Sequence, residues 1–189
     1  TSRQTQMIGW SLIACHLLLT AFSAWVHAPV VDEIAYMPAG ISHWQFADFH
    51  LYRANPPLVR MVGTVPAMLA GYQEDWSAYT TIPGQRSEFR LGMKFFRKNR
   101  EHGFWLVTLG RWMCLPFSLI GALVCWRWST ELYGRLAGLL SLLLWCFCPN
   151  ILGNASLLTP DVAGTSLALA CLYAYWKWSR KGTWQAAGW

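Results

Sequence analysis

Residues 7–26 read MIGWSLIACHLLLTAFSAWV, an apolar stretch without Asp, Glu, Lys or Arg. An α-helix needs about 20 such residues to cross the hydrocarbon core of a bilayer, so the stretch predicts a membrane-spanning helix. A cleavable signal peptide is the alternative, because Arg3 precedes the stretch and Val26-His27-Ala28 resembles a cleavage site. Pro29 directly after that site would hinder cleavage, which favours the spanning helix.

The composition of the whole chain also indicates a membrane protein. Only 13% of its 189 residues are charged and 54% are hydrophobic, whereas about 25% of an average soluble domain is charged. This argues against a soluble enzyme, and a mean hydropathy of +0.26 with 15% aromatic residues excludes a disordered chain. In a membrane protein, the net charge of +6 favours anionic lipid or a phosphate-bearing substrate as partner. The sequence contains no nucleic-acid-binding motif.

Three further apolar runs follow, at about 104–128, 132–148 and 158–178. Each run is interpreted as a span, so we expect an all-α integral membrane protein with about four transmembrane helices. Residues 1–189 would form a single membrane module, in which residues 27–103 are a long loop outside the membrane.

The basic residues predict the orientation of this module. They occur at the N-terminus, in the short link after the second run and in the C-terminal tail, as Arg3, Arg127, Arg135, Lys177, Arg180 and Lys181. The positive-inside rule places these parts in the cytoplasm and residues 27–103 on the outer face. The basic residues of that loop do not contradict this, because loops longer than ~60 residues largely escape the rule.

Two segments of the outer loop are expected to be helical. Residues 33–49 follow Asp32 as a helix cap, and residues 57–69 begin with proline at the first helical position and bend at Pro66. Both helices would lie on the membrane surface with the apolar face down. The rest of the loop is expected to be ordered, with a turn at Pro83-Gly84.

Three acidic residues are candidates for catalysis. Asp32 and Glu33 closely follow the first span, at the depth of lipid headgroups. Asp32 is either a general base, which must come within ~3 Å of the proton it removes, or a helix cap, with Glu33 complementing the helix dipole. Asp161 lies at the start of the fourth run. It is either a residue of the site or a helix cap that follows Pro160. Since the topology puts Asp32 and Asp161 on one face, they can share a cleft.

Three arginines are candidates for binding an anionic group. Arg53 and Arg60 flank the rigid Pro56-Pro57 step, where they can hold a phosphate or diphosphate. Contact with anionic lipid headgroups is the alternative interpretation. Arg111 lies inside the second run, where its side chain either extends to the membrane surface or points into the same cleft as a phosphate ligand.

Metal binding has little support in the sequence. His27, His43 and His50 share the outer loop, but their spacing does not predict convergence on a metal. All six cysteines lie in apolar runs and are interpreted as small hydrophobic residues, and Cys146-x-Cys148 is too closely spaced for the usual zinc site. The cofactor stays open, with a divalent cation as one candidate.

Three features in order resemble a known family. They are Asp32-Glu33-x-x-Tyr36 after the first span, Asn55-Pro56-Pro57-Leu58 in the outer loop, and Leu158-Thr159-Pro160-Asp161 at the fourth span. This arrangement is similar to the N-terminal part of membrane glycosyltransferases of the GT-C superfamily, in the branch of protein O-mannosyltransferases and bacterial aminoarabinose transferases. The resemblance covers nearly the whole chain in layout, although few letters match.

The resemblance implies transfer of a sugar from a polyprenyl-phosphate donor to an acceptor on the outer face of a bacterial inner membrane. Asp32 would be the base that acts on the acceptor, and Glu33 its neighbour in the acidic pair. Asp161 would be a second acid that shapes the site or positions the acceptor or a metal. Such an enzyme would work within the lipid bilayer.

The chain also departs from the family pattern. Asn55 stands where aminoarabinose-type enzymes commonly have lysine, so Arg53, Arg60 or Arg111 would have to compensate the phosphate charge. Ala54 stands where an acid can occur. Family members usually continue through many more spans. The competing hypothesis is therefore a non-catalytic GT-C-like subunit of a membrane complex, whose thirteen tryptophans would suit contacts with other membrane subunits.

Overall fold

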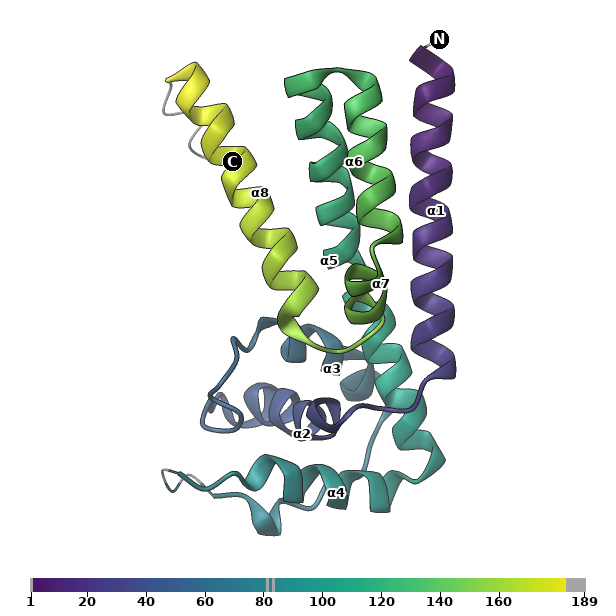
Figure 1. The fold of residues 1–189 in the computed structure, drawn as a ribbon. Coiled ribbons are helices and arrows are strands. Elements are labelled where there is room, and N and C mark those ends of the chain that lie inside the picture. Colours follow the sequence, from purple (N-terminus) through teal and green to yellow (C-terminus); the bar gives the residue numbers. More distant parts are fainter. Residues whose placement is uncertain (1, 81, 83, 183–189) are drawn as a thin grey trace. The chain divides into compact units, whose positions relative to one another are not determined.

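The computed structural model describes residues 2–80, 82 and 84–182, and over these residues the chain is 81% helical without strands (Figure 1). The fold class predicted from the sequence is thus confirmed as all-helical. The helices are α1 (Ser2–Val26), α2 (Val31–Phe46), α3 (Leu58–Ala70), the 3-10 helix η1 (Trp76–Ala78), α4 (Ser87–Asn99), α5 (Glu101–Tyr133), α6 (Arg135–Phe147), α7 (Pro149–Ala155) and α8 (Pro160–Lys181).

The described chain divides into two compact units that interleave along the sequence. One unit, called the bundle unit here, takes the described parts of residues 1–20, 116–154 and 161–189. The other, called the α2–α4 unit, takes the described parts of residues 21–115 and 155–160. Helices α1 and α5 each contribute one end to each unit.

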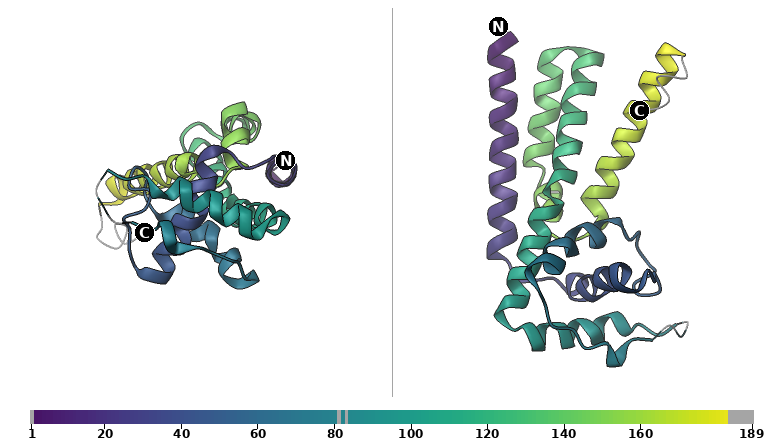
Figure 2. Two further views of the ribbon diagram at one scale, coloured as in Figure 1. Left: turned by 90° about the horizontal axis from the view of Figure 1, so that it is seen from below. Right: turned by 180° about the vertical axis from the view of Figure 1, so that it is seen from behind.

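In the bundle unit, α1, α5 and α6 run side by side (Figure 1, Figure 2). Two glycines allow the close approach of these helices. A Cβ atom on Gly9 of α1 would lie 2.3 Å from the Trp126 ring of α5, and one on Gly138 of α6 would lie 1.9 Å from Thr130 Oγ1. Small residues at such contacts are typical of helices that pack in a membrane.

A buried histidine joins the same three helices. His16 Nε2 lies 2.8 Å from Ser118 Oγ, and His16 Nδ1 lies 3.0 Å from the carbonyl oxygen of Cys146. That carbonyl is in the last turn of α6, where helical carbonyls lack a donor within the helix. A neutral imidazole that donates from Nδ1 to the Cys146 carbonyl and accepts at Nε2 from the Ser118 hydroxyl gives the ring, the hydroxyl and the carbonyl a hydrogen-bond partner each.

Two helical stretches are long and apolar enough to cross a membrane, Arg3–Val26 and Ser87–Tyr133. They contain the predicted spans 7–26 and 104–128, which are confirmed as helical stretches of sufficient length and hydropathy. Helices α6 and α7 meet the same criteria only together, with a bend of 56° between them. The described chain therefore has two candidate spans, or three if the bent pair is one.

The expected four-span count is not confirmed, and the reasons are local. The run 132–148 is interrupted by Gly134, whose φ of 89° ends α5 at Tyr133 and leaves α6 with 13 residues. The run 158–178 is helical within α8, but α8 is not among the helices apolar enough to cross alone. Its polar first turn and its Tyr, Trp and basic residues near the C-terminal end lower its mean hydropathy.

Helix α2 forms the core of the α2–α4 unit and packs against both α3 and α4. Its side chains are buried without interruption from Ala35 to His43. Two glycines bring neighbouring backbones into contact, since a Cβ atom on Gly40 would lie 2.4 Å from the Arg60 carbonyl oxygen and one on Gly92 would lie 2.1 Å from the Ile34 carbonyl oxygen. Gly40 of α2 and Gly92 of α4 therefore allow α3 and α4 to approach the backbone of α2 closely.

The two helices expected in the outer loop are present with small changes of register. Residues 33–49 correspond to α2 and residues 57–69 to α3, which continues through Pro66 to Ala70. Asp32 lies in the first turn of α2 and not at the cap, which is Val30. The expectation that α2 turns an apolar face to the membrane is corrected, because that face is buried inside its own unit.

Glu74, between α3 and η1, is a partly buried acid. Its Oε2 atom is buried and has no hydrogen-bond partner among the described residues. Burial raises the pKa of Glu74 from 4.5 to about 7. Because the folded state then binds the proton more tightly than the unfolded state, stability is lost as pH rises from 4.5 to about 7.

Glu74→Gln is therefore expected to raise the free energy of unfolding at pH 8 by about 1–2 kcal/mol, allowing for the partial exposure of the side chain. At pH 5 the effect should be small, because the wild-type carboxyl is then protonated. Thermal unfolding in detergent, followed by tryptophan fluorescence at both pH values, measures this. Glu101→Gln at an exposed position is the control. Equal stability of wild type and Glu74→Gln at pH 8 would contradict the prediction.

Candidate functional site

Asp32 lies at the surface of the α2–α4 unit, in the first turn of α2. Its Oδ1 atom accepts a hydrogen bond of 2.8 Å from the hydroxyl of Tyr52. Tyr52 is 6% exposed and has a φ of 53°, a left-handed conformation that is rare for a bulky residue. Residues in such conformations cluster at functional sites, and in this conformation the Tyr52 hydroxyl donates to the carboxylate of Asp32.

A chain of polar contacts continues from Tyr52 into the unit. The Tyr36 and Tyr52 rings meet edge to face with 4.5 Å between their centroids. The Tyr36 hydroxyl accepts a hydrogen bond of 2.6 Å from the Asn55 amide, and the Asn55 carbonyl oxygen accepts one of 2.9 Å from Arg60. The structure thus brings together three residues singled out from the sequence: Asp32, Asn55 and Arg60.

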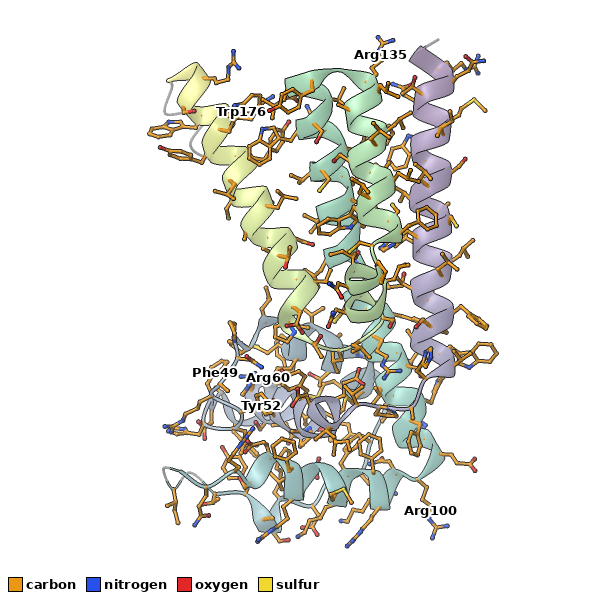
Figure 3. The ribbon with its side chains drawn as sticks, viewed as in Figure 1. Phe49, Tyr52, Arg60, Arg100, Arg135 and Trp176 are labelled. Carbon is orange, nitrogen blue, oxygen red and sulfur yellow. The ribbon has the colours of Figure 1, made fainter. Side chains whose placement is uncertain are left out.

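Arg60 is the buried cation of this network, with 3% of its surface exposed. Its Nε donates to His43 Nε2 at 2.8 Å, and His43 Nδ1 donates to the Asp48 carbonyl oxygen at 2.7 Å. Burial lowers the pKa of His43, so the ring is neutral and accepts the bond from Arg60. The guanidinium carbon lies 5.8 Å from the Tyr52 ring centroid, which places positive charge behind that ring (Figure 3).

A cavity of about 300 Å³ opens beside Tyr52. Its lining consists of His50, Tyr52, Arg53, Ala54, Ile82, Gly84, Gln85, Arg86 and Glu88. Arg86 covers the Tyr52 ring at 5.4 Å and pairs with Glu88 at 2.9 Å, and this hydrogen bond raises the pKa of Arg86. With Arg53 at the same wall, the lining carries more positive than negative charge. The volume lies at the lower end of the range for small-ligand sites.

A second cavity of about 300 Å³ lies next to the first and shares Gln85 and Arg86 with it. Its other lining residues are Ala78, Thr80, Ser87 and Arg90. Arg86 therefore contributes to both cavities, and Arg90 adds a further cation. The two neighbouring cavities are thus both lined by basic side chains.

Glu33 and Arg111 form a buried ion pair in which the hydrogen-bonding groups of both side chains are used inside the protein. Arg111 Nε and Nη2 donate to the two carboxylate oxygens of Glu33 at 2.8 and 2.6 Å, and the side chains are 1% and 0% exposed. The other N–H groups of Arg111 donate to the carbonyl oxygens of Ala24, His27 and Ala28. Glu33 also accepts from the backbone N–H groups of Val30 and Leu158. All five guanidinium donors are thus used inside the protein.

This pair joins the end of α1, the first turn of α2, α5 and the segment before α8. Its geometry gives Glu33 and Arg111 a structural role beside Asp32, because neither group has hydrogen-bonding capacity left for a substrate. The phosphate-ligand hypothesis for Arg111 therefore has no support in this arrangement. The adjacent acids Asp32 and Glu33 have opposite environments, one exposed and one completely buried.

Asp161 belongs to the bundle unit, where it is exposed in the first turn of α8. Asp32 belongs to the α2–α4 unit, so their shared cleft stays a prediction. Among the described residues, no group of three or more His, Cys, Asp and Glu is placed to hold a metal ion. His43 is engaged with Arg60, and His50 lines the cavity beside Asp48.

Two residues of the site have no recognisable signal in the sequence. Tyr52 acts through its unusual backbone conformation, and Arg86 reaches the cavity from a segment far along the chain. Tyr36 is different, since its spacing of four residues from Asp32 places both on neighbouring turns of one helix face.

Comparison of the chain with family models, curated proteins and solved structures gives no match. A function has to be proposed from the residues and their geometry.

Proposed function

We propose that the chain is a membrane glycosyltransferase that moves a sugar from a polyprenyl-phosphate donor to an acceptor, with Asp32 as the general base. The observation that carries the proposal is the hydrogen bond from Tyr52 to the carboxylate of the exposed Asp32, because Tyr52 also lines a cavity with arginines in its wall. The resemblance of three ordered motifs to GT-C glycosyltransferases supports the same assignment.

In the proposed reaction, Asp32 removes the proton from an acceptor hydroxyl or amine. The acceptor atom then attacks the anomeric carbon of the sugar, and the bond from that carbon to the phosphate oxygen breaks. The electron pair leaves with the lipid phosphate, and the configuration at the anomeric carbon is inverted. Tyr52 uses one lone pair of the carboxylate, so further lone pairs can accept the proton of the acceptor.

The departing phosphate gains negative charge and requires donors aimed at it. Arg53 and Arg86 supply these donors from the cavity wall. Arg60 acts as a positioning residue, since its donors go to Asn55 and His43 and its charge reaches the site through the Tyr52 ring. Glu33 and Arg111 position the first turn of α2, and Asp161 is proposed as a second acid near the acceptor.

We further propose that all four apolar runs cross the membrane, with α6 and α7 as one bent span and α8 as the fourth. Residues 27–103 then face the periplasmic side of a bacterial inner membrane. The basic residues near α1, at the turn from α5 to α6 and at the end of α8 support this orientation. In this placement Asp32 and the cavity lie at the outer membrane surface, within reach of a lipid-linked donor.

Binding of undecaprenyl phosphate in mixed micelles, measured by tryptophan fluorescence, tests the phosphate site. Arg53→Gln and Arg86→Gln are each expected to weaken binding by about ten-fold, the effect of one charge-assisted hydrogen bond. Arg97→Gln, at an exposed position in the last turn of α4, is the matched control and should bind as wild type does. Equal losses in all three variants, or no loss in the first two, would contradict the proposal.

The second candidate function is a non-catalytic GT-C-like subunit. The observation that favours it is that two residues of the matched motifs form contacts inside the protein. The Asn55 amide donates to the Tyr36 hydroxyl, and the Glu33 carboxylate pairs with Arg111. This candidate predicts that the chain is required for a partner enzyme and that Asp32→Asn leaves the activity of that complex unchanged.

A further inference from the structure

We propose a second ligand site in the bundle unit, a groove that binds an anionic phospholipid. It is a cavity of about 500 Å³ formed by α1, α5 and the start of α6. The residues that define it are Trp10, Leu123, Trp126, Arg127, Thr130 and Arg135. None of them belongs to the site around Asp32, so the inference is independent of the proposed function.

The groove has an apolar wall suited to a hydrocarbon chain. Trp10 of α1 and Trp126 of α5 meet edge to face with 5.8 Å between their ring centroids, and Leu123 lies one turn further along α5. Gly9 makes this wall possible, because a side chain there would collide with the Trp126 ring. Tryptophan rings are also the side chains that favour the level of lipid headgroups.

The other end of the groove carries positive charge. Glu131 is the one acid among the residues lining this cavity, and it is compensated by Arg127, Lys177 and the Tyr173 hydroxyl at 3.2, 3.2 and 2.7 Å. Arg135 is exposed and has no ion-pair or hydrogen-bond partner in the part of the chain that the structure describes (Figure 3). An anion at the mouth of the groove would therefore meet an uncompensated guanidinium.

The apolar wall fits a hydrocarbon chain and the exposed Arg135 fits a phosphate, so a phospholipid is the occupant that matches the whole groove. The face of α1 that carries Trp10 exposes apolar side chains, with Met7 at 64% and Trp10 at 56%. In a membrane this face contacts acyl chains, so a lipid can enter the groove sideways with its phosphate at Arg135. Free phosphate would use only the charged end. Basic pockets between membrane helices are typical sites for anionic headgroups.

Native mass spectrometry of the full chain, released from micelles that contain equal amounts of phosphatidylglycerol and phosphatidylcholine, tests the proposal. Wild type is expected to retain phosphatidylglycerol in preference. Arg135→Gln should reduce that preference by about five-fold, the effect of one basic residue at an anionic membrane surface. Arg180→Gln removes an exposed arginine outside the groove and should not change it. Leu123→Trp, which fills the groove, should reduce retention of both lipids.

Three results would overturn the proposal. Equal retention of the two lipids by wild type would show that the groove does not select an anion. Equal losses in Arg135→Gln and Arg180→Gln would show that surface charge alone attracts the lipid. Displacement of phosphatidylglycerol by inorganic phosphate would show that the occupant is a free anion. Unfolding temperatures of the variants establish that each of them is folded.

Discussion

Asp32→Asn is expected to lower the rate of sugar transfer by about 10²–10⁴-fold, the usual contribution of a general base. Asparagine keeps the size of the side chain and can still accept the hydrogen bond from Tyr52, so the architecture of the site is preserved. The loss should therefore fall on kcat, with little change in KM for the donor. The measurement is transfer from a panel of polyprenyl-phosphate sugars to a hydroxyl or amine acceptor by the protein in micelles.

Glu101→Gln is the control for this experiment, because it removes an exposed carboxylate at the start of α5 without touching the cavity. Its rate should equal that of wild type. Full activity of Asp32→Asn would remove Asp32 from the role of base. An unchanged rate in a complex that needs the chain would instead favour the non-catalytic subunit.

Arg111→Met is expected to destabilise the protein by about 3–5 kcal/mol, as removal of one partner from a buried ion pair usually does. The substitution leaves the Glu33 carboxylate buried beside two backbone N–H groups and leaves three backbone carbonyls without their donor. For a chain of this length the unfolding temperature should fall by roughly 10 °C. Thermal unfolding in detergent, followed by tryptophan fluorescence, measures the effect.

Arg127→Met provides the comparison with an exposed pair. Arg127 is 71% exposed in its contact with Glu131, so its loss should cost less than about 1 kcal/mol. The double variant Glu33→Gln/Arg111→Met should be more stable than the sum of the single variants implies, because the lone buried charge is gone. Equal stability of Arg111→Met and wild type would show that the pair contributes nothing to folding.

The sequence predicts α2 and α3 because their signals are local, whereas α4 lies in a part of the outer loop for which the sequence predicts only a turn at Pro83-Gly84. A charge-free run marks α1, a mainly apolar run that contains Arg111 marks the later part of α5, and proline marks the start of α3. Asn55 and Arg60 could be grouped in advance, since they lie at the end of the α2–α3 connection and at the start of α3, whereas Asp32 lies at the other end of α2. Their contact through Tyr36 and Tyr52 was beyond prediction, because it depends on the left-handed conformation of Tyr52.

Other features depend on contacts distant in sequence. Glu33 and Arg111 are 78 residues apart, and no spacing rule indicates that they would pair and saturate each other. The apolar composition of α2 was interpreted as a membrane-facing surface, whereas its small residues allow α3 and α4 to cover it. The four-span count is not confirmed from helix length and hydropathy, because the positive φ of Gly134 divides the run 132–148 into the end of α5 and the short α6.

The most direct test of the proposed site is a structure of the protein with a bound polyprenyl-phosphate sugar. We expect the phosphate within hydrogen-bond distance of Arg53 or Arg86 in the cavity beside Tyr52. The anomeric carbon should face Asp32, with space for an acceptor atom about 3 Å from the carboxylate. A donor phosphate bound outside this cavity, with the anomeric carbon turned away from Asp32, would contradict the assignment of Asp32 as the base.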